Sequence, residues 1–159
     1  MKSGSDSTPK LTAQAPKLRL FFDADVLIAG AASTAGASHL LLRLAELGVL
    51  EGITTRLARA EAERNLRAKL PHALPAFRAL IREAIEVVDN PPLSTCVAFS
   101  TQAEVEDVPH LAAAVTQGCH YLVTFNTRHY RPEAGTIEAV KPGKLLQLIR
   151  RQLVALAAL

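Results

Sequence analysis

The sequence predicts an α/β protein in which helices cover both faces of a parallel or mostly parallel β-sheet. Short apolar, β-favouring runs alternate along the chain with longer segments that have helical spacing, which is typical of strand–helix–strand units. The first run, LRLFF from Leu18, is nearly all apolar, as expected of a strand buried on both faces. With 159 residues, 49% of them apolar and 21% charged, the chain fits one globular domain with one core.

The elements are expected in the following order along the first half of the chain. The first strand spans residues 18–22 and ends at Asp23. It is followed by a loop of small residues (30–36), a helix that stops at Gly48, a strand (LEGIT, 50–54), and a helix with a possible Thr cap and a closing Pro (54–71). The second half is expected to hold a helix (75–84), a strand (IEVV, 85–88), a turn (DNPPLS, 89–94), a helix (104–118), a strand (120–126), a further strand (136–140) and a closing helix (142–159). In such sheets ligands bind beyond the carboxyl ends of the strands, where Asp23 and Asn126 would lie.

Composition narrows the function classes. Residues 1–16 are polar, with no apolar stretch of signal-peptide length, so we expect a disordered tail there and a single domain over residues 17–159. No run is long enough to cross a bilayer, and Cys96 and Cys119 form neither a disulfide framework nor a zinc-type pair, so we expect a soluble cytoplasmic protein with no membrane partner. The net charge of +3 permits a nucleic-acid partner without requiring one. The chain lacks the GxxxxGK[ST] phosphate loop of NTPases.

Acidic residues recur at positions where an α/β sheet would gather them. Asp23 and Asp25 directly follow the first strand, where a carboxylate can either hold a divalent cation or form a solvated strand end. Glu61 and Glu63 share a predicted helix but point about 200° apart, so at most one of them faces a given site. Asp107 precedes the Pro of a helix start, where an acid ordinarily caps the helix. Three acids brought together would need a cation, and oxygen ligands suit Mg²⁺ or Mn²⁺.

Three segments resemble, in order and spacing, the motif regions of PIN-domain proteins: LRLFFDADVLIAG, RLARAEAERNL and DVPHLAAAVTQGCHYLVTFNTRHY. The resemblance covers roughly residues 18 to 146, and its last segment is the most specific. It implies a three-layer α/β/α fold and a Mg²⁺- or Mn²⁺-dependent endoribonuclease that cleaves single-stranded RNA. Many small bacterial members are toxins paired with an antitoxin protein, and a homodimer is common among similar proteins.

The resemblance also implies site residues. By position, Asp23, Glu61 and Asp107 would hold the metal, and Asn126 would complete the catalytic set. Ser38 and Thr124 could orient substrate phosphate or water, although a buried hydroxyl bonded to backbone is equally compatible with either. Arg128 could contact phosphate, as could the arginines of the predicted second helix, although a solvated helix face explains most of the latter (Arg56, Arg59, Arg64 and Arg67).

The chain departs from the PIN pattern at two positions. His120 stands where many relatives have Asp, and Asn126 stands where many have a further carboxylate. An amide oxygen brings no charge and attracts a cation less than a carboxylate does, so an alternative function remains: a catalytically weak or inactive PIN-like module that binds RNA or protein. His110, His120 and His129 lack zinc-helix spacing and are expected to form hydrogen bonds or to lie at the surface.

A second enzyme class also matches the first segment. FFDADVLI resembles the opening motif of haloacid-dehalogenase-like phosphatases, in which the first Asp is the nucleophile. Those enzymes need a downstream Lys, and this chain has none between Lys69 and Lys141. The residues therefore favour the PIN resemblance.

Overall fold

The computed structural model describes residues 16–159. The expected tail, residues 1–16, therefore lies outside the described residues except for Pro16.

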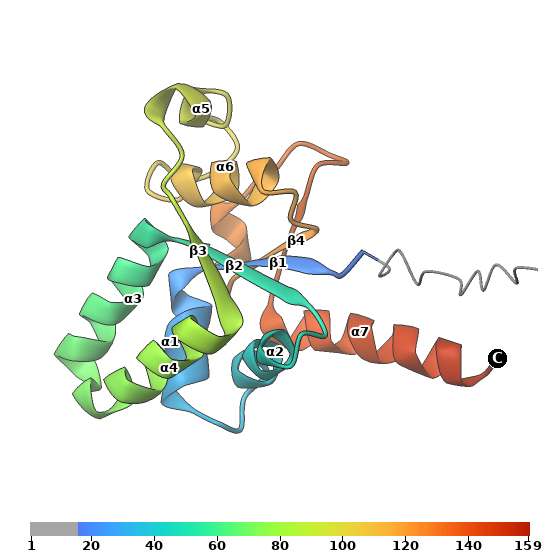
Figure 1. The fold of residues 1–159 in the computed structure, drawn as a ribbon. Coiled ribbons are helices and arrows are strands. Elements are labelled where there is room, and N and C mark those ends of the chain that lie inside the picture. The colour runs from blue at the N-terminus through green and yellow to red at the C-terminus, as the bar shows by residue number, and fades with distance from the viewer. Residues whose placement is uncertain (1–15) are drawn as a thin grey trace, which may run out of the picture.

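Five strands form one sheet that is parallel throughout, in the order β3-β2-β1-β4-β5 (Figure 1). They are β1 (Arg19–Phe22), β2 (Glu51–Thr55), β3 (Ile85–Val88), β4 (Tyr121–Val123) and β5 (Glu138–Val140). From the central β1 the chain builds outward to β2 and β3, then returns to the other side of β1 for β4 and β5. The reversal opens a crevice between the carboxyl ends of β1 and β4, the place where sheets of this kind bind ligands.

Helices lie on both faces of the sheet, so the expected three-layer α/β/α architecture is confirmed (Figure 1). One layer holds α1 (Ala24–Ala32), α2 (Ala37–Glu46), α3 (Arg56–Lys69), α4 (Leu74–Ala84) and the first turns of α7 (Pro142–Ala157). The other layer holds α5 (Leu93–Val97) and α6 (Val108–Thr116). Two short 3₁₀ turns, η1 (Pro71–Ala73) and η2 (Thr127–His129), occur among the described residues.

The alternation of side chains along β1 divides the core in two. Leu20 and Phe22 are fully buried against the layer of α1 to α4, whereas Phe21 is fully buried against α6. Each such side chain contributes about 2 kcal/mol by leaving water. Because side chains of β1 are packed against helices on both faces of the sheet, the position of Asp23, which directly follows β1, is fixed.

The sequence does not predict helix α1: it gives no element for residues 24–29 and a loop for residues 30–36. The helix starts immediately after Asp23, and its sequence ADVLIAGAA is apolar on nearly every side. It packs among α2, α3 and α4, so it has no polar face and shows no helical period in the sequence. Its presence reverses the chain at Asp23 and brings Asp25 back to the same edge of the sheet.

Two boundaries also differ from the prediction. Helix α5 begins at Leu93, inside the stretch predicted as a turn, and α6 begins at Val108 because residues 105–107 form a separate turn. The other expected helices and strands are confirmed to within a few residues.

Within residues 16–159, no single helix is long and apolar enough to span a membrane; α1 and α2 meet that criterion only when taken together, and they are bent by 94° at their junction.

Candidate active site

An acidic pocket of about 540 Å³ opens at the carboxyl ends of β1 and β4. Its lining residues are Asp23, Asp25, Glu61, Glu104, Val105, Glu106, Asp107, Asn126 and His129. Six of these nine side chains are carboxylates. All four residues proposed as the catalytic set therefore reach one pocket, although they come from four separate segments of the chain.

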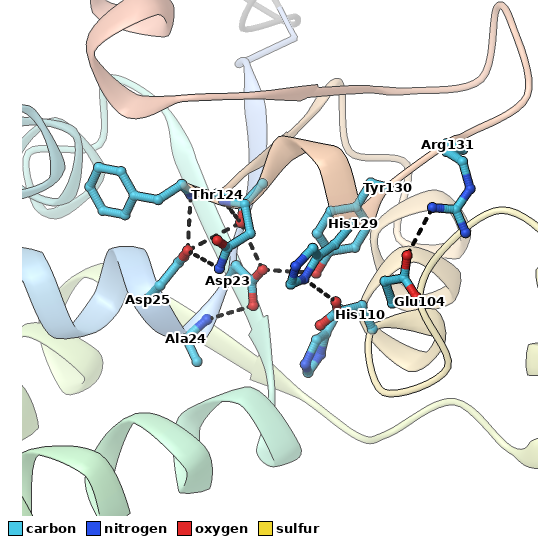
Figure 2. Close-up of polar contacts among 12 residues, drawn as sticks. Asp23, Ala24, Asp25, Glu104, His110, Thr124, His129, Tyr130 and Arg131 are labelled. Carbon is cyan, nitrogen blue, oxygen red and sulfur yellow. Dashed lines mark hydrogen bonds and ion pairs between the residues drawn. The ribbon is translucent and has the colours of Figure 1, made fainter.

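Asp23 is the most buried of these acids, with 7% of its surface exposed. Its Oδ1 accepts a hydrogen bond from the backbone N–H of Ala24 at 2.8 Å, which caps α1. Its Oδ2 accepts the hydroxyls of Thr124 at 2.9 Å and Tyr130 at 2.8 Å (Figure 2). Three donors therefore hold the Asp23 carboxylate in one orientation.

Asp25 lies beside Asp23 and is held from the β4 side. Its Oδ2 accepts from the backbone N–H of Phe125 at 3.0 Å and from Nδ2 of Asn126 at 3.2 Å. Its Oδ1 is buried and has no hydrogen-bond partner among the described residues. Burial raises the pKa of Asp25 to about 6, and repulsion from Asp23 adds to this, while the Phe125 N–H opposes it.

Asp107 occupies the N-cap position of α6 but makes no side-chain capping bond, so the ordinary explanation for an acid there does not apply. Its Oδ2 lies 2.9 Å from Nδ1 of His129. Burial and the nearby charge of Asp23 raise the pKa of Asp107, and the contact with His129 opposes that rise. The charge of Asp23 therefore acts on Asp107 across the pocket.

Glu61 enters the pocket from α3 and is 53% exposed. Its Oε2 lies 3.8 Å from Nε2 of His110, and this interaction lowers the pKa of Glu61. Burial lowers the pKa of His110, but Glu61, Asp23 and Asp107 outweigh that effect and raise it overall. The imidazole is therefore surrounded by acids.

The neighbouring Glu63 points elsewhere, as the helical spacing predicts. Its Oε1 lies 2.8 Å from Arg78 and 3.6 Å from Arg67, outside the acidic pocket. Of the two glutamates on α3, only Glu61 faces the proposed site.

The proposed substrate contacts fare differently. Thr124 is fully buried and its hydroxyl serves Asp23, so it orients a carboxylate and is not open to substrate. Arg128 is exposed in η2, next to the pocket residue His129, and forms no ion pair with any described residue. Ser38 does not line the pocket: it is 3% exposed and sits at the start of α2, against Gly30 near the far end of α1. The sequence did not show α1, which separates Ser38 from Asp23.

His120 is also displaced from the site. It precedes β4, at the opposite end of the sheet from the pocket, where its Nδ1 accepts from the backbone N–H of Arg19 at 2.9 Å. His120 is thus a hydrogen-bonding histidine, as expected, and its replacement of an acid removes no charge from this pocket. Asn126, the second departure, does line the pocket.

Sequence reasoning missed several side chains that the fold brings to the site. Asp25 is considered beside Asp23 in the sequence but is left out of the expected metal-binding set, although it follows Asp23 by only two residues. His129 is expected from the sequence to form a hydrogen bond or to lie at the surface, and Glu104 and Glu106 fall at the start of the helix predicted over residues 104–118. Tyr130 carried no signal, because a tyrosine in a loop has no periodic pattern that reports its partner.

The donor set of the pocket fits a hard cation. Apart from His129, its ligand atoms are oxygens, and the unpartnered Oδ1 of Asp25 is buried. Burial first, and then repulsion from Asp23, raise the pKa of Asp25, and a cation would offset both effects. In the described part of the chain no three Asp, Glu, His or Cys side chains are grouped closely enough to hold an ion by themselves. In general, Mg²⁺ takes one or two protein carboxylates directly and keeps several waters.

Comparisons with solved structures show the same fold. The chain is 21% identical to PAE2754 from Pyrobaculum aerophilum, with a TM-score of 0.58 over 89% of this chain and 97% of that one. It is 17% identical to a chain of a toxin-antitoxin complex from Klebsiella pneumoniae, with a TM-score of 0.59 over 77% and 97%. It is 11% identical to a chain of VapBC2 from Rickettsia felis, a complex bound to a promoter DNA fragment, with a TM-score of 0.56 over 78% and 98%.

A search of curated protein sequences gives no match. The sequence profile of the PIN domain, however, matches residues 19–128, which is more than half of the chain and includes Asp23, Glu61, Asp107 and Asn126. The chain therefore belongs to the PIN-domain family.

Proposed function

We propose that this chain is a metal-dependent endoribonuclease that cleaves single-stranded RNA and acts as the toxin of a toxin-antitoxin pair. The observation that carries the proposal is the convergence of six carboxylates on one pocket, with the buried Oδ1 of Asp25 unpartnered there. Uncompensated negative charge of this kind costs free energy that a bound divalent cation offsets.

Within the proposal, Asp23, Glu61 and Asp107 hold Mg²⁺ or Mn²⁺, directly or through water, and Asp25 adds a fourth carboxylate. When bound, the cation supplies Lewis-acid chemistry, which stabilises the charge that develops on a phosphodiester attacked by water. Thr124 and Tyr130 keep the Asp23 carboxylate oriented, and Asn126 does the same for Asp25 through its amide N–H. These hydrogen bonds hold the carboxylates of Asp23 and Asp25 in place, so the two side chains need little rearrangement during the reaction.

Two arginines are the best candidates for holding the RNA backbone. Arg64 lies one turn beyond Glu61 on α3, close enough to lower the pKa of that carboxyl, and Arg128 projects from η2. Neither forms an ion pair with any residue in the described range, whereas Arg56 pairs with Asp89. Unpaired guanidinium groups beside an acidic pocket can bind the phosphates that flank a cleaved bond.

The alternative, a catalytically weak or inactive PIN-like module that binds RNA or protein, depended on His120 and Asn126. The position of His120 at the other end of the sheet removes the first reason. The pocket retains six carboxylates even with an amide at position 126, which supports an active site.

The proposed protein partners are an antitoxin and a second copy of the chain. Two of the structural relatives come from a toxin-antitoxin complex and from VapBC2, which supports the first. The end of α7 extends beyond the body of the domain (Figure 1) and exposes Leu153, Val154 and Leu156, apolar surface that a protein partner would cover.

The function can be tested with purified protein and an unstructured RNA. Cleavage is expected with Mg²⁺ or Mn²⁺ and none with EDTA, and duplex RNA or single-stranded DNA of the same sequence should remain intact. Full activity in EDTA would overturn the metal-dependent mechanism. Induced expression in a bacterial host tests the toxin role, since the native chain should arrest growth and Asp23→Asn should not.

A further inference from the structure

Tyr130 does not line the acidic pocket, but it contacts the lining residue Asp23. The side chain is 5% exposed, and its hydroxyl donates to Oδ2 of Asp23 at 2.8 Å (Figure 2). A buried hydroxyl needs a partner, and a carboxylate acceptor makes the bond shorter and stronger than one between neutral groups. The contact joins residues 107 positions apart in the chain.

The hydrogen bonds of Asp23 account for most of its acceptor capacity. A carboxylate oxygen has two lone pairs. On Oδ2 one is taken by Tyr130 and the other by Thr124, whose hydroxyl lies nearer to this oxygen (2.9 Å) than to Oδ2 of Asp25 (3.3 Å). Among the described residues, Oδ1 accepts only the N–H of Ala24. The remaining acceptor position of Asp23 therefore lies on Oδ1, and Tyr130 is one of the two groups that determine this.

Tyr130 also belongs to the stretch that anchors residues 103–107, the loop that leads to Asp107 and the start of α6. Ala103 forms an isolated antiparallel bridge with Tyr130, and the N–H of Glu104 donates to the carbonyl of His129 at 2.9 Å. Arg131 completes the clamp through an ion pair with Glu104 at 3.1 Å. A single short segment thus holds Asp23 through the tyrosine hydroxyl and the loop of residues 103–107 through its backbone.

We propose that Tyr130 is a positioning residue of the active site, which blocks Oδ2 of Asp23 and so leaves Oδ1 to face a divalent cation. This inference rests on the proposed function for its catalytic consequence. The proximity of Tyr130 to a bound cation can be tested without any measurement of cleavage.

The kinetic test is Tyr130→Phe, which removes only the hydroxyl. At saturating Mn²⁺ we expect kcat to fall about 10- to 100-fold, the usual effect of losing a group that orients a metal ligand. The KM for RNA should stay unchanged, because Tyr130 is buried and cannot touch substrate. Tyr121→Phe is the matched control, since it removes the only other tyrosine hydroxyl of the chain, at the opposite end of β4. Native kcat in Tyr130→Phe, with folding verified by circular dichroism, would overturn the proposal.

The second test uses terbium(III) as an oxygen-seeking probe whose emission is sensitised by a nearby tyrosine. The chain has two tyrosines and no tryptophan, so each tyrosine can be removed in turn. We expect sensitised emission from the native protein, retained in Tyr121→Phe and mostly lost in Tyr130→Phe and in Asp23→Asn. No emission from the native protein, or loss only in Tyr121→Phe, would place the cation away from Tyr130 and overturn the inference. An RNA-inactive protein that still shows the expected emission would contradict the nuclease function while leaving the cation beside Tyr130.

Discussion

The two ends of the parallel sheet differ in how their charges are balanced. At the amino end, Arg19 forms an ion pair with Glu51 at 2.6 Å, and its backbone N–H donates to Nδ1 of His120, so these three residues are paired. At the carboxyl end, Asp23 and Asp25 lie beside each other, and one oxygen of Asp25 has no partner among the described residues. The amino end nevertheless has the larger hollow, about 710 Å³ against about 540 Å³. The proposed active site therefore lies at the end with unbalanced charge and not at the end with the larger cavity.

The sharpest way to break this comparison is Asp23→Asn. The substitution keeps the shape and can still cap α1, but it removes a charge from the centre of the acidic cluster. We expect cleavage to fall on the order of 100-fold or more, with little recovery at high metal concentration. Rates should be measured across a Mn²⁺ titration, and a variant that regains native activity at high Mn²⁺ would show that Asp23 only tunes the affinity.

The two glutamates of α3 provide a matched pair on one helix. Glu61→Gln should reduce cleavage at least about tenfold, the lower bound for a residue that holds or orients the metal. Glu63→Gln should leave the rate near native, and its exposed pairs with Arg67 and Arg78 predict a stability loss of at most about 1 kcal/mol. The reverse result would mean that the wrong glutamate faces the site.

The raised pKa of Asp25 predicts a pH-dependent stability in the metal-free protein. An acid whose pKa is higher in the folded state, here about 6 against 3.8, favours folding while it is protonated. That contribution is complete below pH 3.8 and is lost as the pH rises through about 6.

The side chain at position 25 stays neutral at every pH in Asp25→Asn. The free energy of unfolding of the native protein should therefore fall by up to about 3 kcal/mol relative to this variant as the pH rises from 3.8 to above about 6. Urea unfolding in EDTA from pH 4 to pH 7.5 measures the difference. A difference that does not change with pH would show that the fold does not disfavour the ionised form of Asp25. Added Mn²⁺ should restore the stability of the native protein mainly at the higher pH.

Asn126→Asp examines the pocket residue that carries no charge. The amide of Asn126 now donates to Asp25, so an aspartate there replaces an attraction by a repulsion in the absence of metal. We expect lower stability in EDTA and a several-fold lower Mn²⁺ concentration for half-maximal cleavage, with the saturated rate nearly unchanged. An unaltered metal requirement would place position 126 outside the ligand set.

The smallest effect is expected at the other end of the sheet. His120→Ala removes the acceptor of the Arg19 N–H at an exposed position and should cost about 1 kcal/mol or less of unfolding free energy. Cleavage rate and metal dependence should match those of the native protein. A changed metal requirement in this variant would contradict the separation of the two sheet ends.

Much of the fold could be predicted because its signals are local. The apolar run of β1, the Thr55 cap of α3 and the alternation of strands with helices each depend on residues close in the chain. Helix α1 could not be predicted in this way, since burial on nearly all sides removes the helical period that would reveal it. The same helix explains why Ser38 was placed at the site although it lies elsewhere.

For the site, the sequence by itself determined which residue types could act: the acids that follow a buried strand, the outward direction of Glu61 relative to Glu63, and the family motifs that contain them. Only the tertiary structure decided which of them meet. Hydrogen bonds such as those of Tyr130 and Thr124 to Asp23 join residues more than 100 positions apart, and no local pattern encodes such partners. The raised pKa of Asp25 and the cluster of carboxylates in one pocket arise only when the folded chain brings these residues together between β1 and β4. Burial and electrostatic repulsion depend on distance in space and not on distance along the chain.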